Sequence, residues 1–137
     1  IFIDYTEKTV YHGNFYDSRY ALEGELVTAK GTYFKGNFGK GKRIDGTLWF
    51  NDVSFYKGHF FDNKPQGQGE FVYEDGSCYK GNFYHGKREA EGKMAYSNGD
   101  SYSGSWYQGL YKGLGTLVIS GIGEYTGYWE DGKKHGK

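Results

Sequence analysis

The sequence has one cysteine and one proline, and its acidic and basic residues cancel at 17 of each. The single cysteine, Cys78, excludes an internal disulfide framework and is compatible with a reducing compartment. One proline in 137 residues argues against a proline-rich linker. Zero formal charge leaves no global field that would attract nucleic acid, so anion binding would need a local patch.

Long apolar runs are also missing. The chain has no apolar stretch of roughly 18 residues and no charged-then-apolar leader, so neither a spanning helix nor a signal peptide is predicted. We therefore expect a cytoplasmic protein. Glycine is abundant, with 24 residues, and aromatic residues make up 20% of the chain. Disordered chains lack aromatics, so this composition predicts a folded domain.

A short aromatic-x-Gly-x-aromatic phrase recurs through the chain and predicts a repeat protein. It starts at six positions, and the intervals between starts are 23 residues except for one of 22. A second glycine follows each of the first five starts after 13 residues, or after 12 in the short repeat. The copies are YHGNF at 11, FKGNF at 34, YKGHF at 56, YKGNF at 79, YSGSW at 102 and YTGYW at 125.

Each repeat contains two stretches of alternating apolar residues. In residues 79–83 the aromatics and the glycine share one parity, and in residues 92–96 Met94 and Tyr96 do the same. A period of two indicates β-strands, and the glycine-rich polar segments between them indicate turns. We therefore predict an all-β fold without helices: an elongated, open stack of antiparallel β-hairpins in a single-layer twisted sheet. About twelve strands at 4.8 Å each would extend roughly 55–60 Å.

Stacking the hairpins would place the aromatics in two rows that share a core. One hairpin is marginal in water, whereas a stack of six buries a continuous surface. The glycine between the two aromatics, such as Gly81, is expected to leave room for the ring arriving from the neighbouring repeat. The rows are Tyr11, Phe34, Tyr56, Tyr79, Tyr102 and Tyr125, and Phe15, Phe38, Phe60, Phe83, Trp106 and Trp129.

This pattern resembles the MORN (membrane occupation and recognition nexus) repeat family over essentially all of the chain. The shared features are Tyr-x-Gly-x-Trp/Phe, then Gly-Lys, then Gly-x-Gly, at a period of 23 residues. The repeats starting at 56 and 102 carry both glycines of the last pair. The repeats starting at 11, 34 and 79 lack the first of them and have Leu22, Asp45 or Ala90 nearby.

Both ends of the chain fall inside a repeat. Residues 1–10 fit the second half of a preceding repeat, full repeats start at 11, 34, 56, 79 and 102, and residues 125–137 fit the first half of a further repeat. We therefore expect a MORN-repeat array over 1–137 that is a segment of a longer one. The alternative is self-association, in which the half-repeats of two molecules meet head to tail.

The residues show no pattern typical of an enzyme, a metal site or a cofactor site. The histidines His12, His59, His85 and His135 are scattered over different repeat positions, and none has a second ligand at metal spacing. Cys78 has no histidine fixed beside it, and the glycine pairs cannot form a phosphate loop because no helix follows them. Several carboxylates recur with the repeat, which favours a structural role: Glu23, Asp45, Glu70, Glu89, Glu91 and Glu124.

A basic ridge is the first candidate site. Cations recur at the hairpin turns, and stacking would space them roughly 10 Å apart along one edge. Such a row could bind anionic lipid headgroups, at about 1 kcal/mol for each cation. The alternative is that they pair with nearby carboxylates, such as Glu89, and only solubilise the turns. The ridge consists of Arg19, Lys42, Arg43, Lys64, Lys87, Arg88, Lys133 and Lys134.

A second candidate site is a set of aromatics whose parity is opposite to that of the core rows. Exposed tyrosine and phenylalanine side chains are typical anchors for a partner peptide or helix. The alternative is cross-strand packing on the outer face. The set consists of Tyr16, Phe61, Tyr84 and Tyr107.

We favour a non-catalytic scaffold that binds a protein partner along its concave aromatic face. The resemblance implies its setting, a cytoskeletal, ciliary or membrane-associated assembly. One alternative is a module that binds anionic phospholipid, such as a phosphoinositide, through the basic ridge. Another is a targeting appendage of a larger enzyme, such as a lipid kinase or a SET-type methyltransferase. No nucleic acid partner is expected, because the charges balance.

Overall fold

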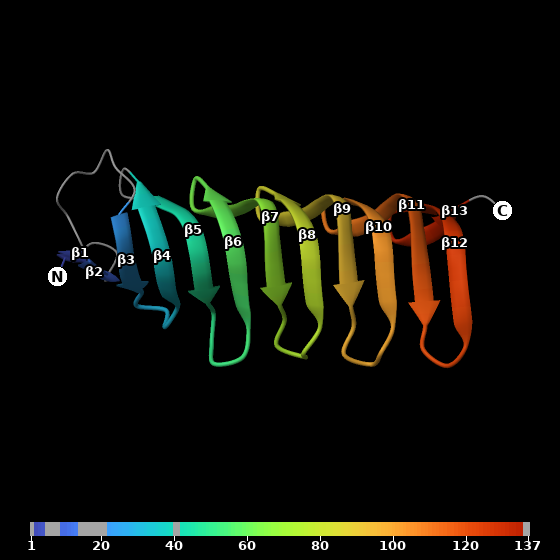
Figure 1. Cartoon of the computed structure of the whole chain (residues 1–137), viewed down its shortest axis with the longest axis horizontal. Helices are drawn as coiled ribbons and strands as arrows, with labels where there is room; N and C mark the ends of the chain where they lie inside the picture. Colours follow the sequence, from blue (N-terminus) through green and yellow to red (C-terminus); the bar gives the residue numbers. More distant parts are fainter. Residues whose placement is uncertain (1, 5–8, 14–21, 40–41, 136–137) are drawn as a thin grey trace.

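The computed structural model describes residues 2–4, 9–13, 22–39 and 42–135. This part of the chain forms one antiparallel sheet of 13 strands, in which each strand pairs with its neighbours in sequence. Figure 1 shows an elongated array with the two ends of the chain at opposite ends of the sheet. The prediction of an open, all-β stack of antiparallel hairpins is confirmed. No helix within the described ranges is long and apolar enough to cross a membrane.

Each repeat supplies a hairpin, and a longer loop leads to the next one. The hairpin turns have two residues, such as His85 and Gly86, and both residues have positive φ, at 50° and 83°. Such turns match the right-handed twist of the flanking strands. The strands are β1 Phe2–Asp4, β2 Thr9–Gly13, β3 Leu22–Val27, β4 Tyr33–Gly39, β5 Lys42–Trp49, β6 Phe55–Phe61, β7 Lys64–Val72, β8 Cys78–Tyr84, β9 Lys87–Ala95, β10 Ser101–Tyr107, β11 Leu110–Ile119, β12 Gly123–Glu130 and β13 Lys133–His135.

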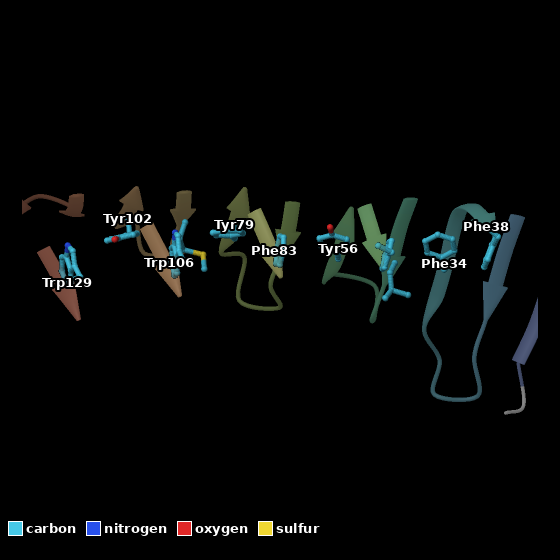
Figure 2. Packing of buried hydrophobic residues seen from close by; sticks show 11 residues of the cluster. Phe34, Phe38, Tyr56, Tyr79, Phe83, Tyr102, Trp106 and Trp129 are labelled. Atoms are coloured by element: carbon cyan, nitrogen blue, oxygen red, sulfur yellow. The ribbon is translucent and has the colours of Figure 1, made fainter. Parts of the chain in front are cut away.

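The core is a continuous line of aromatic rings on one face of the sheet, which we call the inner face. Each ring meets the next edge to face, within a repeat and between repeats alike. Tyr79, for example, contacts Phe83 of its own repeat at 5.1 Å between centroids and Trp106 of the next repeat at 5.3 Å. Figure 2 shows most of the line from Phe38 to Trp129. The ring contacts run through Phe38, Phe34, Phe60, Tyr56, Phe83, Tyr79, Trp106, Tyr102, Trp129 and Tyr125.

This edge-to-face geometry is the one that aromatic quadrupoles favour, and each such pair contributes about 0.5–1.5 kcal/mol beyond its buried area. Tyr56, Tyr79 and Tyr102 have no exposed surface at all. Their hydroxyl groups are nevertheless satisfied, because each donates to a backbone carbonyl three residues ahead. The distances are 2.7 Å from Tyr56 to His59, 2.9 Å from Tyr79 to Asn82 and 2.9 Å from Tyr102 to Ser105.

A row of paired glycines crosses the sheet from β2 to β12 and passes beneath these tyrosines. Gly81 pairs with Gly69 on one side and with Gly92 on the other. A Cβ added to Gly81 would lie 2.4 Å from the Cα of Gly92 and 2.8 Å from the hydroxyl of Tyr79. The expected collision with a ring of the neighbouring repeat is therefore wrong. The space is taken by the paired strand and by the tyrosine of the same repeat, which lies down over the glycines.

The first glycine of the Gly-x-Gly pair has a different role, since it occupies a bulge in the second strand. The β8–β9 register shifts between Gly81 and Phe83, and Ala90 lies within the shift with φ +54°. The equivalent residues Gly67 and Gly113 have φ +76° and +87°. Glycine is therefore the residue best suited there, and alanine occupies the position at a cost of roughly 1–2 kcal/mol.

The short repeat has its missing residue at this same bulge. Between Phe38↔Arg43 and Gly36↔Gly46, only Ile44 and Asp45 lie on β5, whereas three residues lie at the equivalent place on β9. The repeat can therefore lose a residue without disturbing the glycine row. Bulges of this kind bend a strand, and Figure 1 shows the hairpin-turn ends folding over at the top of the view.

Replacing Gly81 with valine should lower the free energy of unfolding by at least about 2 kcal/mol, because the added atoms meet backbone that cannot move aside. The matched control is Lys80→Val, which introduces the same side chain one residue earlier at an exposed position. We expect the control to change stability by less than about 0.5 kcal/mol. Urea unfolding followed by circular dichroism measures both, and equal losses would refute the packing of Tyr79 on the glycines.

High pH should destabilise the array. Burial raises the pKa of Tyr56 and of Tyr102 to about 12, from about 10 in an unfolded chain. The neutral hydroxyls thus favour the folded state fully below pH 10, and this contribution is lost as the pH rises from about 10 to 12. Urea midpoints measured at pH 9, 10 and 11 should fall slightly over the first interval and about three times as far over the second. A double variant, Tyr56→Phe with Tyr102→Phe, should show a shallower fall, and identical slopes would contradict the assignment.

Candidate functional site

The structure divides the predicted basic ridge between two faces. Lys64 and Lys87 begin β7 and β9 and are exposed, whereas Arg88, the next residue on β9, is half-buried against inner-face rings. The same alternation separates Lys42 from Arg43 on β5. On β13, Lys133 and Lys134 are both exposed, but the Lys134 ammonium lies over the inner-face ring of Tyr125. Arg19 and the aromatic candidate Tyr16 lie outside the described residues. Among the described residues, only about half of the predicted ridge cations therefore lie along one edge, and the others lie over inner-face rings.

The inner cations pack on aromatic rings. The guanidinium of Arg88 lies 4.8 Å from the Trp106 ring and 5.7 Å from the Tyr73 ring, and its Nη2 donates to the carbonyl of Gly109 at 2.8 Å. Arg43 lies 5.6 Å from Phe34, and burial lowers the pKa of its guanidinium. These arginines cover the core rings near the hairpin turns, so their guanidinium groups are engaged in packing and are not available to a ligand.

The contact between Arg88 and Tyr73 also shows that the sheet bends toward its inner face. Tyr73 follows the loop end of β7, while Arg88 is next to the hairpin turn of β9. Tyr73 is level with Ser77 and Arg88 is paired with Phe83, so along a straight strand the two rows would be roughly 20 Å apart. Tyr96 and Tyr111 meet across the same gap one repeat further on, hydroxyl to hydroxyl. The inner face is therefore folded onto itself, and its rings are covered by the hairpin-turn ends of the strands.

The carboxylates that could have paired with the ridge have other partners. Asp45 accepts from the Asn37 amide at 2.8 Å, and Glu89 accepts from the backbone N–H of Gln108 at 3.0 Å. The ion pairs within residues 22–39 and 42–135 are Lys42–Asp62 at 2.8 Å and Lys112–Glu130 at 3.3 Å, both well exposed. Within the described residues, Asp45 and Glu89 therefore form no ion pair with the ridge cations. In this part of the chain, Lys64, Lys87 and Lys133 have no ion pair.

The aromatic candidates lie exposed on the outer face, beside the exposed lysines. Phe61, Tyr84 and Tyr107 are 66%, 51% and 47% exposed, and each ends the first strand of its hairpin. The register places Phe61 opposite Lys64, Tyr84 opposite Lys87, and Tyr107 opposite Leu110. We call these six residues the outer row: Phe61, Lys64, Tyr84, Lys87, Tyr107 and Leu110.

The outer row repeats every two strands, or roughly 10 Å. Its third unit lacks the lysine, since Leu110 stands there, but the ammonium of Lys112 lies 5.0 Å from the Tyr107 ring. An aromatic ring next to a cation is thus present in all three units. The rings are local features: Tyr84, for example, packs on His85, at 4.1 Å between centroids. The sequence predicted that the partner binds these residues and also that it binds the concave aromatic face. These residues lie on the outer face, whereas the concave aromatic face is the inner face, so the two predictions refer to different surfaces.

The sequence analysis missed a second aromatic group on the outer face, at the loop end of the strands. Tyr33, Trp49 and Phe55 are cross-strand neighbours on β4, β5 and β6, and the Trp49 and Phe55 rings lie 4.5 Å apart. An open pocket of about 370 Å³ adjoins them, lined by Gly31, Tyr33, Trp49, Asn51 and Asp52. Parity could have found this group, because all three residues are next to core residues in the sequence.

No group of three or more metal-ligating side chains exists within the described ranges. The Cys78 thiol donates to Glu70 at 3.5 Å, and burial, reinforced by that carboxylate, raises the pKa of the thiol. A raised pKa reduces the thiolate form, which is the nucleophile. The geometry is thus that of a structural cysteine.

Comparison with protein families matches the chain to the MORN repeat model at residues 56–78, 79–101, 102–120 and 125–137, together more than half of its length. The matched segments begin at the tyrosines that lie over the glycine row. Comparison with curated proteins found no match.

Arg88 and Lys87 provide a test of the division between the two faces. Arg88→Ala should lower the free energy of unfolding by about 2 kcal/mol, because it removes a desolvated cation–π contact and a charged hydrogen bond. The adjacent Lys87→Ala should change it by less than about 0.5 kcal/mol. Thermal and urea unfolding check both values. If Lys87→Ala were the more destabilising change, the assignment of the two faces would be wrong.

Proposed function

The chain belongs to the MORN repeat family, and we propose that it is a non-catalytic scaffold that binds a protein partner along the outer row. MORN repeats are non-catalytic modules that are generally associated with binding proteins or membrane lipids. The observation that carries the proposal is the regular exposure of Phe61, Tyr84 and Tyr107 on one edge, each beside a lysine. Exposed aromatic side chains are enriched in binding hot spots, and the lysines beside them would favour a partner with complementary acidic residues.

The number of available cations favours a protein over a lipid surface. Arg43, Arg88 and Lys134 pack on inner rings, and Lys42 is paired with Asp62. The three unpaired lysines of the ridge would contribute about 3 kcal/mol at an anionic membrane, at about 1 kcal/mol each. That alone corresponds to a dissociation constant weaker than about 1 mM. Aromatic anchors in shaped contacts can each contribute 2 kcal/mol or more to a protein interface.

The spacing of the outer row indicates what shape of partner fits it. An α-helix advances about 10.5 Å in seven residues and returns to nearly the same face, which matches the interval of roughly 10 Å. An extended strand covers that distance in three residues, which places successive contacts on opposite faces. The partner that fits is therefore an amphipathic helix with apolar residues at heptad spacing and acidic residues beside them to meet Lys64 and Lys87.

The setting of this scaffold is part of the proposal. A cytoskeletal, ciliary or membrane-associated assembly is supported by the family alone. A role as the targeting appendage of a larger enzyme would use the same surface, and it differs only in what the array delivers to the partner.

A designed helical peptide tests the outer row directly. The peptide carries leucine at three heptad-spaced positions with glutamate beside each, and its affinity is measured by fluorescence anisotropy at near-physiological salt. Tyr84→Ser combined with Tyr107→Ser should leave the melting temperature nearly unchanged and weaken binding about tenfold or more. The matched control is Ser103→Ala with Thr116→Ala, which alters the outer face away from the row and should leave affinity unchanged.

Co-sedimentation with phosphoinositide vesicles at low and near-physiological salt tests the lipid-binding alternative. Vesicle binding that persists at the higher salt and is lost on Lys64→Ser with Lys87→Ser would favour the lipid alternative and contradict the proposal. Unfolding of the Tyr84→Ser, Tyr107→Ser variant would also contradict it, since those residues would then belong to the core.

A further inference from the structure

The aromatic group at the loop end of the outer face is a departure from the repeat. Trp49 pairs with Tyr33 on one side and with Phe55 on the other, and all three rings are partly exposed. The equivalents of Trp49 in the following repeats are Val72, Ala95 and Val118. The repeat therefore does not require large rings here, and their presence on a solvent-facing surface needs another explanation.

The loop beside these rings also departs from the repeat, in a way that frees a carboxylate. In the following loop, Asp75 accepts from the backbone N–H of Ser77 at 2.8 Å and so stabilises the turn. In the loop after β5, Asn51 takes that role, and its Oδ1 accepts from the N–H groups of Val53 and Ser54, both at 2.8 Å. Asp52 is therefore not needed for the turn, and its carboxylate has no hydrogen bond or ion pair within the described residues.

The pocket combines these two departures. Tyr33 and Trp49 form its aromatic side, and Asp52 contributes the free carboxylate. A second carboxylate lies close by, because the Tyr33 hydroxyl donates to Glu25 at 2.7 Å. An aromatic face next to negative charge attracts a cation, through the ring quadrupole and through direct attraction.

The chemistry selects among cations. A primary ammonium is strongly hydrated, whereas a guanidinium is weakly hydrated, stacks flat on an indole ring and binds a carboxylate through two parallel hydrogen bonds. A quaternary ammonium would stack on the rings but has no N–H group to donate to Asp52. We infer that this pocket, formed by Tyr33, Trp49 and Asp52, receives an arginine side chain from a protein partner.

This site is separate from the outer row. Phe55 and Phe61 lie at opposite ends of β6 on the same face, roughly 20 Å apart along the strand. The inference therefore does not depend on the proposed helix-binding row. The variant Tyr84→Ser with Tyr107→Ser should keep full affinity for arginine, so failure of one proposal can be told from failure of the other.

Trp49 reports on its own pocket in a titration. The side chains of Trp106 and Trp129 are buried and donate their indole N–H groups to the carbonyls of Gly92 and Gly115, so their signals serve as internal controls. We would titrate the full 137-residue chain with acetyl-Gly-Arg-Gly-amide and follow the three indole N–H resonances by NMR. We expect a saturable shift of the Trp49 signal alone. The matching citrulline peptide, which is neutral and nearly isosteric, should bind at least about tenfold more weakly.

Two variants test the roles of the carboxylate and the ring. Asp52→Asn should reduce the affinity for the arginine peptide about tenfold and bring it close to that of the citrulline peptide. The matched control Asp75→Asn, one repeat further on, should leave it unchanged. Trp49→Val, which introduces the residue found at the equivalent position 72, should abolish binding. Because Asp52 is exposed and has no hydrogen bond or ion pair within the described residues, its variant tests the site even if Trp49→Val alters stability.

Three results would overturn the inference. Equal binding of the arginine and citrulline peptides would reduce the pocket to an apolar surface. Unchanged affinity in Asp52→Asn would remove the carboxylate from the site. Tighter binding of a trimethyllysine peptide than of the arginine peptide would show that the rings select a quaternary ammonium instead.

Discussion

In the repeats that start at 56, 79 and 102, a tyrosine ring lies over a cross-strand pair of glycines, and the rest of the array depends on the space that those glycines leave. The ring of Tyr79 fits only because neither Gly81 nor Gly92 carries a side chain. Lying flat, it places its hydroxyl on a backbone carbonyl and its edge against the phenylalanine and tryptophan rings on either side. The same placement in successive repeats turns separate hairpins, each marginal alone, into one line of aromatic contacts.

This core occupies the inner face almost completely. The strands bend over it, and Arg88 and Tyr111 on the second strands close it by meeting Tyr73 and Tyr96 across the fold. A cation that sequence spacing assigns to the surface can therefore belong to the core, as Arg43 does. What remains for recognition is the outer face, where side chains are free of the packing constraint and their identity can follow function.

The outer face shows two kinds of pattern. The outer row follows the repeat, so its contacts recur at roughly 10 Å and suit a partner with a periodic structure of its own. The pocket at Tyr33, Trp49 and Asp52 breaks the repeat, since the equivalent positions further along are smaller or take part in the turn. The rings of Tyr33 and Trp49 and the unpaired carboxylate of Asp52 are therefore features that the stacking of repeats does not require.

The sequence by itself determined the architecture. Alternation of period two, turn residues at fixed intervals and a 23-residue repeat allow only stacked hairpins, and they also identify Phe61, Tyr84 and Tyr107 as opposite in parity to the core. The parity of a residue shows which face of the sheet its side chain lies on, but not how close two side chains come when the strands bend. It could therefore not reveal that Arg88 contacts Tyr73, or that the Tyr79 ring covers the glycines of its own repeat. Nor could it show that Asn51 replaces Asp52 in the turn, because that depends on hydrogen bonds within one loop. Only the tertiary structure decided which charges are available for binding, because burial and pairing depend on how strands bend and which loops meet.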